Sequence, residues 1–306
     1  MRRAIGWLLA LTFGAALAAG AAAQGLQFHV HGLAFPRDGK ALLAATQRGL
    51  VAYREGSWTR VRGPAYDLRA LSATAEALVA SGYRVPGNPP VEPLGFVRSR
   101  DGGATWQAAL LEGEAAFHVA AAGYRSGMLY FFSPWPLPRL PVPGLYAARA
   151  DGRNWERVPA RGLQGWVLGL AAHPDDAMTV AAATTTGLFV SRDGGARFRR
   201  LARGGVVSAV AFGGGSANLY YAYAYSRTLI VSSPDGRQRR HIELPIAWTD
   251  VVDRIAENPA APRQIAIATR WQDVYLSING GATWDRIAAG GREPGEDEED
   301  PGRSGP

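Results

Sequence analysis

Histidine, aspartate and arginine side chains gather near the starts of several short apolar segments, and these residue types bind ions and transfer protons. His29 and His31 lie two positions apart, which places both imidazoles on one side of an extended strand. Asp67 and Arg69 have the same spacing. Paired imidazoles beside a carboxylate are suitable ligands for a divalent metal. The pattern is therefore compatible with a metal held by His29, His31 and His118.

Six segments can be aligned as equivalent strands, and the alignment brings further polar residues to one place. The aligned residues are Gly32, Ala70, Ala121, Gly169, Ala209 and Arg254. Just before them, polar side chains concentrate in the first three segments and the last. We expect one ligand-binding cluster from His29, His31, Asp67, Arg69, His118 and Asp253. The alternative is a hydrated polar lining, in which pairs such as Arg69 with Asp253 join neighbouring segments.

Two proline-rich insertions, 83–93 and 131–143, contain nine of the 20 prolines. Such loops are stiff, and Tyr83 and Trp135 within them are candidate ligand or partner contacts. The alternative is a packed cap over the middle of the molecule.

Enzymatic motifs are scarce. The chain has no cysteine, which excludes disulfides, thiolate metal sites and cysteine nucleophiles. It also lacks the G-x-S-x-G turn of serine hydrolases. Glycoside hydrolysis needs two carboxyl groups about 5–9.5 Å apart. Asp67, Asp250 and Asp253 are the candidate acids for that chemistry, and otherwise we expect no catalytic residue.

A repeated motif of the form S-x-D-G-G-x-x-W, here called the box, predicts the elements that position these residues. Full copies span 99–106, 191–198 and 277–284, and partial copies include 150–155 and 233–236. Their Asp or Asn positions and aromatic residues are Asp101, Trp106, Asp151, Trp155, Asp193, Phe198, Asp235, Asn279 and Trp284. The steps between the Asp or Asn positions are 50, 42, 42 and 44 residues, which is typical of a β-propeller blade.

We therefore predict an all-β chain with one β-propeller of six four-stranded blades, seven being the alternative. The units span about 27–62, 65–112, 116–160, 165–203, 205–245 and 249–289. Each box is expected to be the turn between a third and a fourth strand, with a structural role. Ligands should bind on the opposite face, at the mouth of the channel.

The box resembles the Asp-box, or BNR, repeat of sialidases, sortilin-type receptors and photosystem II assembly-factor propellers. The opening His29-Val30-His31-Gly32-Leu33 followed by Thr46-Gln47-Arg48-Gly49-Leu50 is similar to that of uncharacterised exported bacterial BNR propellers labelled as glycosyl hydrolases. The resemblance implies the fold. It does not imply sialidase activity, because the Arg-Ile-Pro start of sialidases is absent.

The chain ends predict export and a charged tail. Residues 1–23 have the basic start, apolar stretch and small-residue cleavage site of a secretory signal peptide. The propeller should span 24–290, and 291–306 should be a disordered acidic tail. The net charge is +7. We expect a periplasmic or secreted monomer that binds a protein or an anionic ligand, has no membrane span after cleavage and does not bind nucleic acid.

From these patterns we expect a non-catalytic binding or assembly platform that acts through one face of the ring. The alternative is a sialidase-like glycoside hydrolase. No cofactor is required by any motif, apart from the divalent metal considered for the three histidines.

Overall fold

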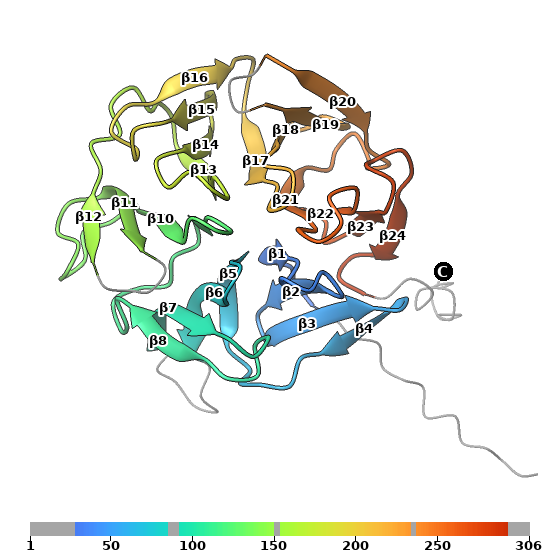
Figure 1. Cartoon of the computed structure of the whole chain (residues 1–306), viewed down its shortest axis with the longest axis horizontal. Coiled ribbons are helices and arrows are strands. Elements are labelled where there is room, and N and C mark those ends of the chain that lie inside the picture. The colour runs from blue at the N-terminus through green and yellow to red at the C-terminus, as the bar shows by residue number, and fades with distance from the viewer. Residues whose placement is uncertain (1–27, 85–91, 150–153, 234–236, 293–306) are drawn as a thin grey trace, which may run out of the picture.

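The computed structural model describes residues 28–84, 92–149, 154–233 and 237–292, and these form a closed ring of six antiparallel sheets (Figure 1). Four consecutive strands make each sheet, so the prediction of six four-stranded blades is confirmed. The signal-peptide and acidic-tail predictions fall on residues outside the described ranges. No helix in the described ranges has the length and apolar character needed to cross a membrane.

The strands of the first three blades are β1 (Gly32–Ala34), β2 (Leu42–Thr46), β3 (Gly49–Arg54), β4 (Ser57–Arg60); β5 (Asp67–Ala73), β6 (Leu78–Arg84), β7 (Glu92–Ser99), β8 (Gln107–Leu110); β9 (Ala120–Ala122), β10 (Met128–Ser133), β11 (Gly144–Arg149), β12 (Trp155–Arg157). Those of the last three are β13 (Val167–Ala172), β14 (Val180–Thr184), β15 (Gly187–Ser191), β16 (Arg199–Ala202); β17 (Val207–Phe212), β18 (Leu219–Tyr223), β19 (Thr228–Ser232), β20 (Arg239–Glu243); β21 (Val252–Glu257), β22 (Ile265–Thr269), β23 (Val274–Ser277), β24 (Asp285–Ala288).

The hydrophobic core is divided among the junctions between blades. Six clusters of buried side chains each combine residues of two adjacent blades, one cluster per junction. At the junction of blades 2 and 3, Phe131 is fully buried and its ring lies 5.1 Å from that of Phe96 and 4.9 Å from that of Phe117. Apolar burial between sheets therefore holds the ring together.

The ring closes without exchanging a strand between its first and last blades, because each sheet is built in chain order. Instead, the segment before β1 bonds to blade 6. The Phe28 amide donates to the Gly291 carbonyl at 2.9 Å, and the Val30 amide donates to Gln272 Oε1 at 2.6 Å. The Trp58 indole donates to the Ile287 carbonyl at 2.7 Å and is buried in the same junction.

The box turns connect the third and fourth strands, as predicted. In blade 2, Ser99 Oγ donates to Asp101 Oδ1 at 2.8 Å, and the same oxygen accepts from the Thr105 amide at 2.9 Å. Blades 4 and 6 repeat this arrangement around Asp193 and Asn279. Hydrogen bonds from Thr105 and Ser99 lower the pKa of Asp101 to about 2.

The second glycine of the box has two constraints. Gly281 has φ 89° and Gly103 has φ 101°, a region that favours glycine. A Cβ added at Gly281 would lie 2.6 Å from Cγ2 of Ile242, in the preceding blade. The aromatic residue of the box also packs backwards, since Phe198 is buried against blade 3. The box is thus a joint between blades.

The other predicted box residues are placed as follows. Asp151 and Asp235 lie outside the described ranges, while Trp106, Trp155 and Trp284 are half-buried in junction clusters.

Candidate functional site

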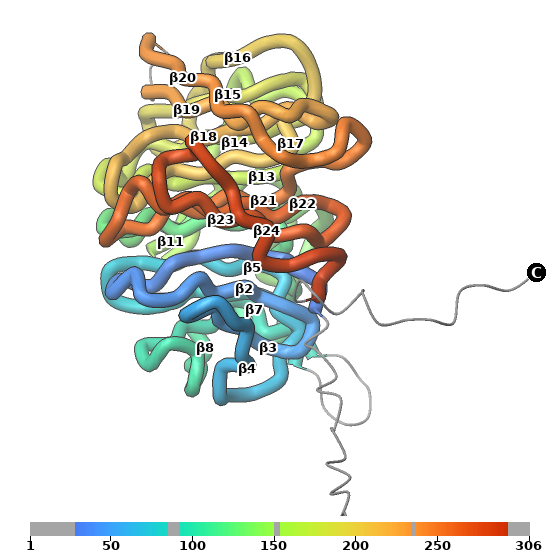
Figure 2. The backbone as a smooth tube through the Cα atoms, turned by 90° about the vertical axis from the view of Figure 1, so that its right-hand side faces the viewer, coloured from blue at the N-terminus to red at the C-terminus, as the bar shows by residue number. Residues whose placement is uncertain are grey.

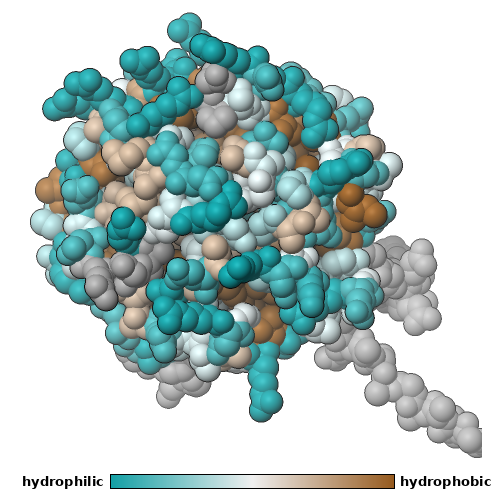
Figure 3. All heavy atoms as spheres, in the orientation of Figure 1, coloured by the Kyte–Doolittle hydropathy of each residue, from teal (hydrophilic) through white to brown (hydrophobic). Residues whose placement is uncertain are grey.

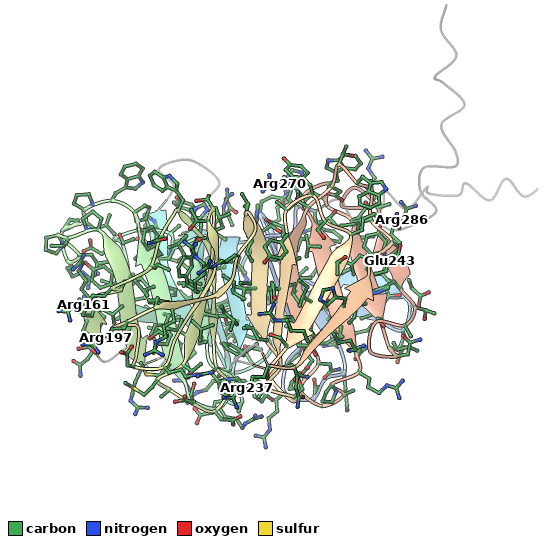
Figure 4. The ribbon with its side chains drawn as sticks, turned by 90° about the horizontal axis from the view of Figure 1, so that it is seen from above. Arg161, Arg197, Arg237, Glu243, Arg270 and Arg286 are labelled. Atoms are coloured by element: carbon green, nitrogen blue, oxygen red, sulfur yellow. The ribbon has the colours of Figure 1, made fainter. Side chains whose placement is uncertain are left out.

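The inner strands of the six blades surround a central cavity of about 170 Å³. The aligned inner positions are small in five blades, which leaves space on the ring axis, while Arg254 occupies that position in blade 6. The name top face is used here for the side where the inner strands begin and where the second strand connects to the third. The box turns lie on the opposite side, called the box face. Figure 4 shows this separation, with Arg270 of a second-to-third connection on one side and Arg237 of a third-to-fourth turn on the other.

Four inner strands carry a β-bulge at the same place, where the channel opens on the top face. The register shifts lie between Leu68 and Ala70, Val167 and Gly169, Val207 and Ala209, and Val252 and Arg254. The extra residues are Arg69, Leu168, Ser208 and Asp253. A bulge redirects a side chain and ends regular pairing. The mouth is therefore lined by side chains that leave the normal alternation of a strand.

Two ion pairs occupy the polar half of the mouth. Arg69 Nη2 lies 2.6 Å from Asp67 Oδ2, and Arg254 Nη1 lies 2.9 Å from Asp253 Oδ2. Arg254 Nε also donates to the His31 carbonyl at 2.7 Å, which joins blade 6 to blade 1. The predicted pairing of Arg69 with Asp253 is not the one observed, because each arginine pairs with an acid of its own strand.

The histidines at the mouth favour the neutral form. Burial, with the charge of Arg69 next, lowers the pKa of His31 to about 4. The pKa of His118 is lowered by the same causes in the same order. Asp67 acts on both imidazoles in the opposite direction. Asp67, Arg69 and Arg254 act on both His31 and His118, and Asp253 joins this group through its ion pair with Arg254. The structure thus places these residues together at the mouth, while their binding of a ligand stays a prediction.

His29 lies at the edge of that group. Its side chain is exposed and its amide donates to Gln47 Oε1 at 2.9 Å. In the described ranges, no set of three or more His, Cys, Asp or Glu side chains is placed to hold a metal ion. The geometry therefore gives no support to a metal at His29, His31 and His118.

The candidate acids for hydrolysis are separated in the structure. Asp253 lines the central cavity, whereas Asp250 lines a different groove on blade 6. Asp250 is 2% exposed and its Oδ1 accepts from the Val251 amide at 2.7 Å and the Trp271 amide at 3.2 Å. Asp67 and Asp253 are held in ion pairs. The three acids do not line one common pocket.

The insertion of blade 3 is an ordered, anchored segment between β10 and β11. Leu137 and Leu140 exchange backbone hydrogen bonds, and Leu140 is fully buried. Arg139 Nε lies 2.7 Å from Glu114 Oε1, which ties the insertion to the connection from blade 2. Trp135 projects from this segment and is 69% exposed. Tyr83, from the insertion of blade 2, is the cross-strand partner of Asp67 and so lies beside the mouth, while residues 85–91 of that insertion are outside the described ranges.

A set of exposed aromatic residues on the top face was not predicted as a site. Trp166 precedes β13, Tyr225 follows β18, Trp248 precedes β21 and Trp271 follows β22. Their exposed fractions are 69%, 65%, 70% and 55%. Eight of the ten exposed large hydrophobic residues in the described ranges lie on the top face; Met178 and Ile278 are on the box face. The available signal was a tryptophan surrounded by polar residues in a turn, as in Arg270-Trp271-Gln272-Asp273.

Trp271 also borders the blade 6 groove, whose volume is about 600 Å³. Tyr275 Oη donates to Asp273 Oδ2 at 3.1 Å, and burial together with Asp273 raises the pKa of Tyr275 to about 12. Arg286 faces the same carboxylate at 3.8 Å. The groove therefore adds an aromatic surface with charged groups of both signs to the outer part of the top face.

Comparison with known proteins identifies a fold. No protein-family model matches the chain, and no curated protein sequence matches it. A GH74 xyloglucanase from Xanthomonas campestris superposes with a TM-score of 0.54 at 18% identity, covering 87% of this chain and 46% of that one. This chain thus spans about half the length of the xyloglucanase.

Two further structures are similar over most of both chains. One is XC5397, a gluconolactonase from Xanthomonas campestris, with a TM-score of 0.56 and 17% identity over 80% of this chain and 84% of that one. The other comes from a nidogen/laminin complex, with a TM-score of 0.57 and 13% identity over 77% and 88%. At these identities the likeness concerns architecture alone. The chain is a six-bladed β-propeller.

Proposed function

We propose that this chain is an exported, non-catalytic propeller of the BNR/Asp-box type that binds a protein partner through its top face. The observation that carries the proposal is the concentration of exposed aromatic residues there. Trp166, Trp248, Trp271 and Trp135 are each more than half exposed, although burial of a tryptophan would be favourable. Tryptophan, tyrosine and arginine dominate binding energy at protein interfaces.

The apolar and the charged side chains lie on opposite halves of the mouth, and this distribution supports docking of a partner around it. The apolar half of the mouth is formed at the start of blades 4 and 5, by the exposed side chains of Trp166, Leu168 and Val206. Asp67 with Arg69, and Asp253 with Arg254, form the polar half. An apolar surface beside polar groups with fixed positions is the usual anatomy of a specific interface. A small anionic group of the partner has two arginines within reach at the mouth.

The alternative function is a glycoside hydrolase that uses Asp67, Asp250 and Asp253. Exposed tryptophans would also stack on sugar rings, and this favours a saccharide as the ligand in that case. The positions of the acids are less favourable, because Asp250 is buried and accepts from the Trp271 amide, and the other two acids are in ion pairs. Two acids that flank one bond are required.

The test compares tryptophan variants of the top face with matched variants of the box face. Tagged chain is expressed in its source organism, complexes are separated by native electrophoresis and the partner is identified by mass spectrometry. We expect one defined complex that is lost in Trp166→Ala/Trp271→Ala, because a tryptophan hot spot contributes about 2 kcal/mol or more. Ile278→Ala/Met178→Ala removes two exposed apolar side chains from the other face and should retain the complex.

Retention of the complex by the tryptophan double variant would contradict the proposal. Glycosidase turnover that disappears in Asp67→Asn or Asp253→Asn, with unchanged folding, would establish the alternative instead.

A further inference from the structure

Arginines are concentrated on the outermost strands of blades 4 and 5. β16 and β20 carry Arg199, Arg200, Arg239 and Arg240, here called the arginine rim, with Glu243 as their only acid. The outermost strands of the other four blades together carry Arg60, Arg157 and Arg286 against Glu156 and Asp285. The basic charge of the ring edge is therefore concentrated on two adjacent blades.

The two strands of the arginine rim lie next to each other along the edge of the ring (Figure 1). Arg239 Nη2 donates to the Leu201 carbonyl of β16 at 3.1 Å, which crosses the junction between the blades. Arg240 Nη1 donates to the Gly280 carbonyl of blade 6 at 2.8 Å. Figure 3 shows hydrophilic side chains along the upper outline, where these strands lie in Figure 1.

The charge of the arginine rim is not neutralised within the described ranges. None of its four side chains forms an ion pair there. Arg200 donates to Gln164 Oε1 and lies 5.1 Å from the centre of the Phe189 ring. Neutral partners thus orient the guanidinium groups of Arg200, Arg239 and Arg240 and leave their charge available. A guanidinium group offers paired donors to carboxylate, sulfate or phosphate.

The basic edge continues toward blade 3. Arg161 and Arg197 lie on two chain segments that are joined by backbone hydrogen bonds. The Arg161 amide donates to the Ala196 carbonyl at 3.0 Å, and the Phe198 amide donates to the Arg161 carbonyl at 2.7 Å. Both are exposed, and Figure 4 shows them on the side of the ring. The edge thus presents a curved row of arginines rather than a single cluster.

The surroundings of the row distinguish among anionic partners. No exposed large hydrophobic residue lies on β16, on β20 or in their described connections to β15 and β19. A protein interface would lack its usual apolar anchor there. The edge is also convex when it is seen along the ring axis (Figure 1), and Figure 2 shows β16 and β20 together at one end of the ring. A flat membrane or a rigid duplex would meet only a short part of it, whereas a flexible polymer can follow the curve.

We propose that the arginine rim binds an anionic polysaccharide, a linear chain with a carboxylate or sulfate group on successive sugars. Binding arises from release of counterions as guanidinium groups replace them. This site is separate from the top face, and it stands whether or not the top face binds a protein.

The experiment measures binding of the purified protein to polygalacturonate, dextran sulfate and uncharged dextran across a series of salt concentrations. The two charged polymers distinguish carboxylate from sulfate. The test variant is Arg199→Gln/Arg200→Gln/Arg239→Gln/Arg240→Gln. The matched control removes four exposed cations from blade 1, as Lys40→Gln/Arg54→Gln/Arg60→Gln/Arg62→Gln. The double variant Arg199→Gln/Arg200→Gln serves if the quadruple variant does not fold.

We expect at least one charged polymer to bind, and dextran not to bind. The rim variant should lose about tenfold or more in affinity, and the slope of log Kd against log salt should fall by about 3, since each contact contributes about 0.7–0.9 for nucleic acids. The control should change less than about twofold. Equal losses in both variants would overturn the proposal, because affinity would then follow net charge alone. Duplex DNA is measured in the same assay, and tighter binding to the duplex than to either charged polysaccharide would also overturn the proposal.

Discussion

Acidification tests the electrostatics of the channel mouth through His31. The folded protein holds this imidazole neutral, since its pKa falls from 6.5 to about 4 through burial and the charge of Arg69. Between those values the unfolded chain binds a proton that the folded chain does not. The contribution of His31 to the free energy of unfolding is therefore fully present above pH 6.5 and is lost as the pH falls toward 4. The pKa values of His118 and His173 are also lowered and act in the same direction.

The magnitude follows from the shift in pKa. One unit corresponds to about 1.36 kcal/mol, so moving from pH 7.5 to pH 4.5 lowers the free energy of unfolding by at most about 2.5 kcal/mol through His31. Because the side chain is only partly buried, solvent reduces this to about 1–2 kcal/mol.

Urea unfolding of the wild type and of His31→Gln, at pH 7.5 and pH 4.5, measures this contribution. The variant should lose about 1–2 kcal/mol less than the wild type over this range. His241→Gln is the matched control, because His241 is exposed on β20, and it should behave as the wild type. Identical pH dependence for the wild type and His31→Gln would refute the assignment of the acid sensitivity to the mouth.

Three further predictions concern the joints between blades. Gly281→Ala should cost about 2–5 kcal/mol in the free energy of unfolding, because the added Cβ is overpacked against blade 5 and the residue has a positive φ. Gly280→Ala, with φ 76° but open space around it, should cost about 1–2 kcal/mol. Equal losses of the two variants in chemical unfolding would mean that the contact with blade 5 contributes nothing. Glu257→Ala should cost about 3–5 kcal/mol, because Glu257 accepts from the amides of Gly215 and Ser216 at 3.0 and 2.9 Å in a buried position, and Glu257→Gln should recover most of that loss in thermal unfolding. Phe131→Ala should cost about 3–5 kcal/mol by leaving a cavity among aromatic rings, and a loss below about 1 kcal/mol would mean that the junction relaxes around it.

The repeat made the fold predictable because the box is a local structure. The hydrogen bonds of Asp101 and Asn279 join residues at most four positions apart, so the residues that make them recur in the sequence wherever the turn occurs. Four strands separate successive boxes, and the number of blades follows. The two-residue spacing from His29 to His31 and from Asp67 to Arg69 placed these residues at the start of inner strands for the same local reason.

The details of the mouth depend on pairing between strands, which a single sequence does not display. The bulge at Asp253 exists only in the register of β21 against β22. It turns Asp253 toward the cavity, while Asp250, three residues earlier, is buried against the Trp271 amide. Trp135 was predicted as a contact, but Trp166, Trp248 and Trp271 were missed, because turns have no periodicity and the exposure of these side chains depends on how neighbouring blades pack.

Site-specific photocrosslinking tests most directly whether the top face is the binding face. A photoreactive amino acid replaces Trp166 at the mouth in one variant and Ile278 on the box face in another; these side chains are 69% and 67% exposed. Illumination in the source organism should join one defined protein to the Trp166 position and none to the Ile278 position. The same product from both positions, or a product from Ile278 alone, would contradict a top-face binding site.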